Sequence, residues 1–382
     1  MDTSNLSGIV VVIDDEVDEK DTNINKLVES IKDVRHPCLT YNDVPDIEMA
    51  PHLSGAPFIV LDWQLCSESM PSGFQREKRK EQLDFITKLK ETCFCPIFIY
   101  TNSDIDEVKS TLRKKNLIND DLTDSILIRH KTELEPEKVL EAFSEWVTKN
   151  PAVHTLVNWE NTYEKAKNNL FSEFYSLSHA WPKVLWDTYK NDGADPSEEL
   201  GSMITRNLHS RMQPFRFDEN VFGDEYPSDK TEIRKVLSGE KFLTHLGEDT
   251  VRCGDVFKIG GTYYINVRPD CDCVLMRSSE DLDLYLLKLQ SISANKEKNL
   301  FNKNRGNFDE RDDECIVFNM FNQKTFAIKF KQLKIIPWGE CSKDRKGRLL
   351  PPYITRTLQR YSLYMQRAGF PKTPEQAIFD AE

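Results

Sequence analysis

The chain has 382 residues, a length that accommodates two or three domains. Its formal net charge of −12 disfavours attraction of the whole chain to nucleic acid or to an anionic membrane. The longest wholly aliphatic run, Ile9–Ile13, is far too short to span a bilayer, and Met1–Ser7 lacks the features of a secretory signal. Nine cysteines, an odd number without a repeating spacing, favour reduced thiols. We therefore expect a cytoplasmic protein.

Four short apolar runs in the first part of the chain each end next to a residue that can carry chemistry. Such runs are typical of the buried strands of a parallel sheet, in which functional groups lie at the carboxyl ends of the strands. The runs and the residues that follow them are Ile9–Ile13 with Asp14 and Asp15, Phe58–Leu61 with Asp62, Pro96–Tyr100 with Thr101, and Ser125–Ile128 with Arg129, His130 and Lys131.

Helical periodicity fills the intervals between these runs. Helices are predicted around Ile24–Ile31, Leu83–Leu89, Asp104–Lys115 and Glu135–Val147, and one more strand around Cys38–Tyr41. Five alternations of strand and helix predict an α/β fold with a doubly wound, parallel, five-stranded sheet over residues 1–149. A polar passage, Ser67–Gln82, reads as a long connection beside Asp62.

Asp14, Asp15 and Asp62 converge at one edge of this sheet if the first and third strands are neighbours. Three carboxylates so close together repel one another unless a cation is present. Oxygen ligands of this kind suit Mg²⁺. The sequence therefore predicts a magnesium site.

An acid pair, an acid, a hydroxyl and a lysine, each at a strand end and in this order, resemble the receiver domain of two-component response regulators over residues 8–148. The resemblance implies a flavodoxin-like fold and a phosphoacceptor that catalyses its own phosphorylation at most, rather than an enzyme with a separate substrate. The roles it implies are Asp62 as phosphoacceptor, Asp14, Asp15, Asp62 and the backbone carbonyl of Gln64 as Mg²⁺ ligands, and Thr101 and Lys131 as contacts to the phosphoryl oxygens.

Two positions depart from the family pattern. Thr132 replaces the proline that usually follows the lysine, and Ile128 stands where many members carry an aromatic switch residue. These departures put the usual switching mechanism in doubt more than they do phosphorylation. A degenerate receiver that keeps the fold without being phosphorylated is the alternative.

Residues 150–245 are predicted to form a helical linker or bundle. Leu156, Trp159, Tyr163, Ala166 and Leu170 follow spacings of 3, 4, 3 and 4, which indicate a helical seam. Packing inside a bundle is one interpretation, and a homodimer through the Leu156–Leu170 helix is the other. Aromatic helical sequence continues to a loop at Asn191–Pro196, and a second helix is predicted at Glu198–Met212.

Residues 246–382 predict a small antiparallel barrel-like domain with a C-terminal helix. Val256–Ile259 and Thr262–Val267 are joined by Gly260-Gly261, a strong hairpin signal because both glycines tolerate positive φ. The other predicted elements are strands at Cys273–Met276, Cys315–Phe321 and Thr325–Ile336, helices at Leu282–Ile292 and Ile354–Met365, and a polar insertion at Asn295–Asp313.

Two further patterns admit more than one interpretation. Cys271 and Cys273, with Cys253 and Cys341, suggest zinc, but the spacing is a poor match and buried cysteines on one strand face are the simpler interpretation. Lys324–Arg348 contains eight basic residues among Phe326, Phe330 and Trp338, a pattern found in nucleic-acid surfaces. A solvated face, or a dock for the acidic remainder of this chain, is the simpler interpretation.

Together these patterns predict a bacterial-type signalling protein. A receiver-like domain accepts a phosphoryl group on Asp62 from a histidine-kinase-like partner, and a helical linker relays the state to an output region without a helix-turn-helix. One alternative is a receiver-fold scaffold or binding module that works without phosphorylation. Another is a nucleic-acid-acting effector that uses Lys324–Arg348.

Overall fold

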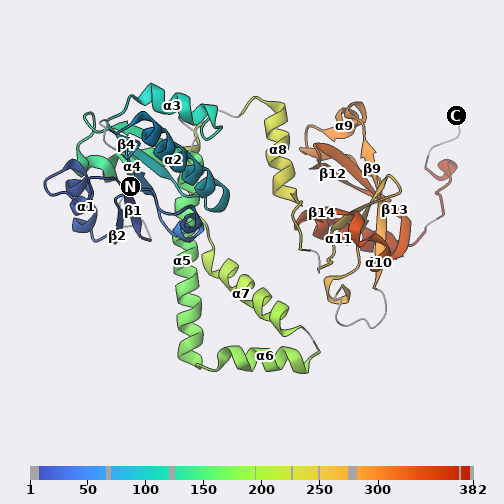
Figure 1. Ribbon diagram of the computed structural model, residues 1–382. Helices are drawn as coiled ribbons and strands as arrows, with labels where there is room; N and C mark the ends of the chain where they lie inside the picture. The colour runs from blue at the N-terminus through green and yellow to red at the C-terminus, as the bar shows by residue number, and fades with distance from the viewer. Residues whose placement is uncertain are drawn as a thin grey trace. The chain divides into compact units, whose positions relative to one another are not determined.

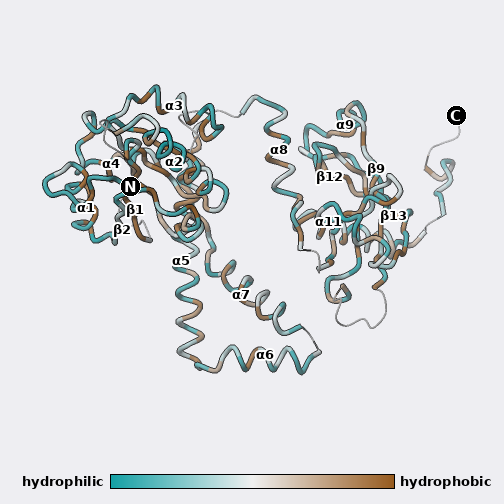
Figure 2. Tube along the Cα trace, viewed as in Figure 1, coloured by the Kyte–Doolittle hydropathy of each residue, from teal (hydrophilic) through white to brown (hydrophobic). Residues whose placement is uncertain are grey.

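The computed structural model describes residues 8–65, 70–119, 125–193, 195–224, 227–247, 250–273, 282–369 and 371–378. The chain divides into two units, residues 1–224 and residues 225–382, each with a main sheet of its own. Apolar residues concentrate along the strands of both sheets (Figure 2). Among the described residues, no helix is both long enough and apolar enough to cross a membrane.

The first unit is built on a five-stranded sheet in which every pairing is parallel (Figure 1). Its order, β2-β1-β3-β4-β5, is the strand order of flavodoxin-like folds, which confirms the predicted α/β class. The strands are β1 (Val10–Ile13), β2 (Cys38–Tyr41), β3 (Ile59–Leu61), β4 (Ile97–Thr101) and β5 (Ile126–His130).

Helices cover both faces of this sheet, so alternate residues of each central strand enter different cores. On one face, Val10, Val12 and Val60 pack with α1 (Asn23–Asp33) and α4 (Val139–Lys149). On the other, Val11, Ile13, Ile59 and Leu61 pack with α2 (Ser72–Thr92) and α3 (Ile105–Lys114). Two 3₁₀ helices, η2 (Ile47–Leu53) and η3 (Pro136–Lys138), complete the helical cover of the sheet. Burial on both faces explains the uninterrupted apolar runs.

Helix α2 begins well inside the passage that the sequence assigns to a connection. Residues 72–82 are helical, and residues 66–69 lie outside the described part of the chain. The buried residues of α2 begin only at Gln82, so its first ten residues carry no apolar stripe. Without that stripe, periodicity could not distinguish a solvent-exposed helix from a loop.

Three helices extend the first unit beyond its sheet: α5 (Pro151–Leu177), α6 (Trp181–Asn191) and α7 (Pro196–Met212) (Figure 1). The Asn150 side chain caps α5 by accepting a hydrogen bond from the Val153 amide at 3.2 Å. Val153 and Val157 then join the core formed by α1 and α4, which fixes the base of α5 to the sheet. A short 3₁₀ helix, η4 (Glu219–Phe222), contacts α5.

The predicted seam of α5 divides between two environments. Ala166 and Leu170 are buried, and α5 packs against α6 and α7. Leu156 and Tyr163 are half-buried, whereas Trp159 is 42% exposed and stacks on Tyr163. The bundle interpretation therefore holds for the outer half of the seam, and Trp159 remains available for other contacts.

The second unit contains an antiparallel seven-stranded sheet in the order β12-β13-β9-β8-β7-β14-β6. This confirms the predicted antiparallel domain, including the Gly260-Gly261 hairpin. The strands are β6 (Phe242–Leu243), β7 (Asp255–Ile259), β8 (Thr262–Asn266), β9 (Asp283–Ile292), β12 (Glu314–Phe321), β13 (Lys324–Pro337) and β14 (Arg345–Leu349). No strand ladder joins β12 to β6 within the described ranges, but the rings of Phe242 and Phe321 stack at 4.8 Å between these edges.

Strand β9 corrects the sequence prediction of a helix at Leu282–Ile292. Leu284, Leu286 and Leu289 are buried, and the strand pairs with β8 on one side and with β13 on the other. Leucine, lysine and glutamine favour helices locally, but pairing on both edges overrides that preference. The strand predicted at Cys273–Met276 falls mostly on residues 274–281, outside the described part of the chain.

Helices and a small hairpin complete the second unit. The C-terminal helix that the sequence predicts is present as α11, and it packs on β12 and β13. The predicted polar insertion contains a short helix and a two-stranded hairpin. The elements are α8 (Lys230–Lys241), η5 (Asp270–Asp272), α9 (Ala294–Leu300), β10 (Phe301–Asn302), β11 (Asn307–Phe308), α10 (Trp338–Cys341), η7 (Ser342–Asp344), α11 (Tyr353–Gln366) and η8 (Glu375–Ala377).

Replacing Leu170 by glutamate tests the packing of the helical extension. Leu170 is only 1% exposed, so a buried, unpaired carboxylate should lower the free energy of unfolding by about 3 kcal/mol or more. Trp159→Glu, on the same helix at an exposed position, should cost less than about 1 kcal/mol. Urea denaturation followed by circular dichroism measures both; equal losses would contradict this packing.

Candidate functional site

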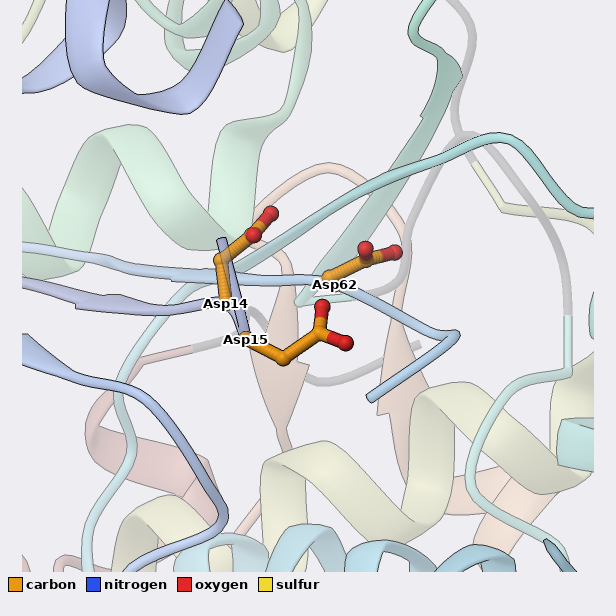
Figure 3. Close-up of side chains that lie close together, drawn as sticks. All are labelled: Asp14, Asp15 and Asp62. Atoms are coloured by element: carbon orange, nitrogen blue, oxygen red, sulfur yellow. The ribbon is translucent and has the colours of Figure 1, made fainter. Parts of the chain in front are cut away.

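Three aspartates meet at the carboxyl edge of the first sheet (Figure 3). The register of β1 and β3 pairs Ile13 with Leu61, so the next residues, Asp14 and Asp62, leave the sheet side by side. One oxygen from each of Asp14, Asp15 and Asp62 lies within 4.8 Å of the others. The structure therefore brings together the three carboxylates that the sequence predicts to converge.

Lys131 joins two of these carboxylates. Its Nζ donates to Asp14 Oδ2 at 2.8 Å and to Asp62 Oδ2 at 2.9 Å, and all three side chains are buried. Lys131 directly follows β5, and its backbone amide donates to the Thr101 carbonyl at the end of β4. Its side chain thus reaches across β4 to the ends of β1 and β3.

A repeated local motif fixes the side chains at three strand ends. Asp14 Oδ1 accepts from the amide of Glu16 at 2.9 Å, and Asp62 Oδ1 accepts from the amide of Gln64 at 3.1 Å. Thr101 Oγ1 accepts from the amide of Ser103 at 3.1 Å. Each side chain thereby accepts a hydrogen bond from the amide two residues later, which is the hydrogen bond that defines an Asx or Ser/Thr turn. In each aspartate the other oxygen, Oδ2, is the one that binds Lys131.

Burial and charge act in opposite directions on the Asp62–Lys131 pair. Burial raises the pKa of Asp62, Lys131 opposes that rise, and Asp14 adds to it. Burial alone would lower the pKa of Lys131, but the charges of Asp62 and Asp14 outweigh it and raise that pKa. Because Lys131 remains protonated, its charge favours the ionised carboxylate of Asp62.

Asp15 is the carboxylate of the cluster with which Lys131 forms no ion pair. Partial burial of its carboxylate, followed by the negative charges of Asp14 and Asp62, raises the pKa of the exposed Asp15 to about 6. No hydrogen bond or ion pair joins its side chain to another residue in the described ranges. With all three carboxylates ionised, the cluster carries a net charge of −2, because Lys131 neutralises only one of the three charges.

A buried amide that sequence analysis missed supports the loop after β3. Gln82, 2% exposed on α2, donates from Nε2 to the Asp62 carbonyl at 2.6 Å. Arg79 donates to the Gln82 side chain and to the Trp63 carbonyl, and its guanidinium lies 3.9 Å from the centroid of the Trp63 ring. Gln82 precedes Phe85, Ile86 and Leu89 by three, four and seven residues, so it lies on the apolar stripe of the helix. A polar residue on that stripe is the sequence signal that could have identified it.

A cavity of about 390 Å³ opens beside this support. The loop that follows Asp62 and the loop that follows Thr101 both contribute to its wall. Its lining residues are Trp63, Gln64, Leu65, Gln75, Lys78, Arg79, Gln82, Ser103 and Glu107.

The two positions that depart from the receiver pattern have structural partners. His130 Nδ1 lies 2.7 Å from Thr132 Oγ1, and His130 Nε2 lies 2.9 Å from the Asn102 carbonyl. Ile128 is buried in the core beneath α2 and α3. The β4–α3 and β5–α4 loops are thus linked through a histidine rather than through an aromatic residue at position 128.

The cysteines of the second unit do not gather as metal ligands within the described residues, where the three aspartates form the one group with metal-ligand spacing. Cys273 is buried and Cys271 is exposed, because η5 rather than a strand holds this segment. The prediction that both thiols share a strand face is therefore wrong. Burial raises the pKa of Cys253 to about 12 and that of Cys273 to about 11, which makes both thiols unreactive.

Acids of the same unit neutralise four of the eight basic residues in Lys324–Arg348. Lys329 pairs with Glu314, Lys331 with Asp313, and both Arg345 and Arg348 with Asp255. Phe326 and Phe330 lie in the core, where no base could stack on them. These contacts favour the interpretation of the segment as a dock for acidic parts of this chain.

Comparisons with known proteins add little to this geometry. No family model and no curated protein matches the chain. Among solved structures, a solution NMR structure of a de novo designed Rossmann 2x3 fold protein is 15% identical, covering 36% of this chain and 90% of that chain with a TM-score of 0.23. The fold assignment of the first unit therefore rests on its own strand pairing.

Replacing Asp15 by asparagine tests the electrostatics of the cluster. The folded state raises the pKa of Asp15 from 3.8 to about 6, so it binds the proton more tightly than the unfolded chain does. Stability of the metal-free protein should therefore fall as pH rises from about 4 to about 6. Asp15→Asn should remove this loss and raise the free energy of unfolding at pH 7 by about 1 kcal/mol, after allowance for solvent screening, with no gain below pH 4.

Thermal and urea melts in EDTA across this pH range measure the effect, with Glu19→Gln as a control acid in the same loop. Adding millimolar Mg²⁺ should then stabilise the wild type more than Asp15→Asn. An identical pH profile in both proteins would contradict the electrostatic account.

Gln82→Leu tests the buried amide. The change leaves the Asp62 carbonyl and one Arg79 donor without their partner, so we expect the free energy of unfolding to fall by about 2 kcal/mol. Lys80→Leu, an exposed position on the same helix, should change it by less than about 0.5 kcal/mol. Equal denaturation midpoints for Gln82→Leu and the wild type would show that the amide contributes nothing to stability.

Proposed function

We propose that residues 8–148 form a receiver-like phosphoacceptor domain in which Asp62 accepts a phosphoryl group. The observation that carries the proposal is the bridging ammonium of Lys131, 2.8 Å from Asp14 and 2.9 Å from Asp62, at the carboxyl edge of a sheet ordered 2-1-3-4-5. An acid pair, an acceptor acid and a lysine at neighbouring strand ends are the groups that phosphoryl transfer needs for positioning and charge stabilisation.

The donor set fits Mg²⁺. All candidate ligands are oxygens, and Asp15 adds a negative charge that Lys131 does not balance. Asp14, Asp15, Asp62 and the main-chain carbonyl of Gln64 would hold the ion. When bound, Mg²⁺ neutralises the charge on the oxygens of the transferred group.

The remaining chemistry belongs to residues of this chain. An oxygen of Asp62 forms a bond to phosphorus, while the bond from phosphorus to the imidazole nitrogen of a phosphohistidine donor breaks and its electron pair stays on that nitrogen. Lys131 exchanges its contact with Asp62 for a contact with a phosphoryl oxygen, so its charge is never left unpaired. Thr101, buried at the end of β4, supplies a hydroxyl on the same edge.

In this proposal a histidine-kinase-like protein of a bacterial-type, cytoplasmic pathway supplies the phosphoryl group, and the chain relays the state to an output region that lacks a helix-turn-helix. The relay runs through α5, whose base is packed on the sheet, and a homodimer through Leu156–Leu170 would use exposed Trp159. The output region is the antiparallel domain, with the barrel-like closure expected from its sequence.

A receiver-fold scaffold that binds partners without phosphorylation is the competing function.

Replacing Asp62 by asparagine separates the two functions. Wild-type protein incubated with Mg²⁺ and a small phosphodonor should gain one phosphoryl group by intact mass, because Asp62 supplies the nucleophilic oxygen. Asp62→Asn should gain none while keeping its circular dichroism spectrum. Asp106→Asn, an exposed acid on α3, is the matched control and should behave as the wild type. Failure of the wild type to gain mass would favour the scaffold.

A further inference from the structure

The second unit contains a cavity of about 640 Å³ that the proposed phosphoacceptor chemistry does not use. It lies where the edges of the seven-stranded sheet approach each other, between α8, the Asn322–Gln323 turn and strands β6, β7, β8 and β14. Its volume is within the range of small-molecule sites, which often lie at the mouths of curled sheets. Its lining residues are Lys235, Ser238, Gly239, Phe242, Thr244, Lys258, Tyr263, Phe321, Asn322, Gln323 and Lys346.

The charged residues that line this cavity, among those the structure describes, are all lysines. They are Lys235, Lys258 and Lys346, and no described aspartate or glutamate joins them. None of these three lysines forms an ion pair with a carboxylate in the described ranges, in contrast to Lys329 and Lys331 of the same unit. Three unneutralised ammonium groups around one cavity favour a ligand with several negative charges.

This positive charge stands out against the rest of the chain. Residues 225–382 contain 26 lysines and arginines against 23 aspartates and glutamates, a net +3, although the whole chain carries −12. The second unit is therefore the part of the protein that attracts anions.

Aromatic side chains form the apolar part of the cavity wall. The Phe242 and Phe321 rings stack at 4.8 Å, and the half-buried ring of Tyr263 meets Phe321 edge to face at 5.1 Å. Lys258 Nζ lies 5.5 Å from the centroid of the Tyr263 ring. A flat, apolar group and a phosphate can thus be bound within one cavity.

Uncharged polar groups complete the wall. Ser238 donates to the Met320 carbonyl at 3.2 Å, which leaves its oxygen free to accept a hydrogen bond. The side-chain amides of Asn322 and Gln323 form no hydrogen bond with another residue in the described part of the chain. Hydroxyls and amides of this kind suit the sugar and ring edges of a ligand.

Gly239 leaves space on the helical side of the cavity. It lies in the last turn of α8, where glycine is less favourable for the helix than alanine. A Cβ added there would meet no atom within 4 Å. A larger side chain at this position would therefore project from the cavity wall without a clash at its Cβ.

We propose that this cavity binds a nucleotide-sized phosphate ester, with the phosphates on Lys235, Lys258 and Lys346 and the flat ring against the aromatic wall. The site is independent of Asp62 and of Mg²⁺. It gives the second unit a ligand of its own, and hence an input separate from phosphorylation.

Isothermal titration of the full chain in EDTA tests the proposal with ATP, AMP, inorganic pyrophosphate and adenosine as probes. ATP and AMP should bind, pyrophosphate should bind more weakly than ATP, and adenosine should not bind measurably. The Asp62→Asn protein should bind ATP as the wild type does, which separates this site from the proposed phosphoacceptor. Equal binding of ATP and pyrophosphate would overturn the proposal, because it would show only general attraction of anions.

Matched variants locate the site. Lys346→Gln should weaken ATP binding about tenfold, whereas Lys343→Gln, an exposed lysine three residues away and outside the cavity, should leave it unchanged. Gly239→Leu should abolish binding while leaving the melting temperature unchanged or raising it, because leucine favours the helix. Wild-type affinity in both Lys346→Gln and Gly239→Leu would overturn the assignment, as would binding of a single-stranded oligonucleotide without binding of any mononucleotide.

Discussion

The ammonium group of Lys131, held between Asp14 and Asp62, is the interaction on which the first unit depends. Two carboxylates at adjacent strand ends repel each other unless a cation lies between them. That cation comes from β5, two strands away from β3, so the contact requires β1, β3, β4 and β5 to keep their order and register together. A slip of one residue in any of these pairings would move a charge from the edge into an apolar face.

The residues at the strand ends show which parts of the fold and of the site could be predicted from the sequence. In a parallel sheet buried on both faces, an apolar run that ends in an acid marks both the strand and the site, so Asp14, Asp62, Thr101 and Lys131 could be located without a structure. Gln82 could not, because its role depends on which carbonyl the fold places opposite it. Strand β9 was also not predicted, because its pairing partners are distant in sequence and its leucines suit a helix equally well.

In the second unit, charge patterns along the chain differ from charge patterns in space. The basic residues of Lys324–Arg348 form a block in sequence, yet Glu314, Asp313 and Asp255 from elsewhere in the unit neutralise half of them. Conversely, Lys235, Lys258 and Lys346 lie far apart in sequence and meet around one cavity. Net local charge thus follows from strand order, which composition alone does not specify.

The anchoring of α5 has a mechanical consequence. Its first turns are part of the core under α1 and α4, and its 27 residues form one uninterrupted helix about 40 Å long at 1.5 Å per residue. Such a helix acts as a lever, because its base cannot rotate without carrying the far end along. A tilt of about 5° at Val153 would displace Leu177 by about 3 Å, roughly a third of the distance between two packed helices, as estimated from that rise per residue. Rearrangements too small to alter the sheet would therefore be magnified where α5 meets α6.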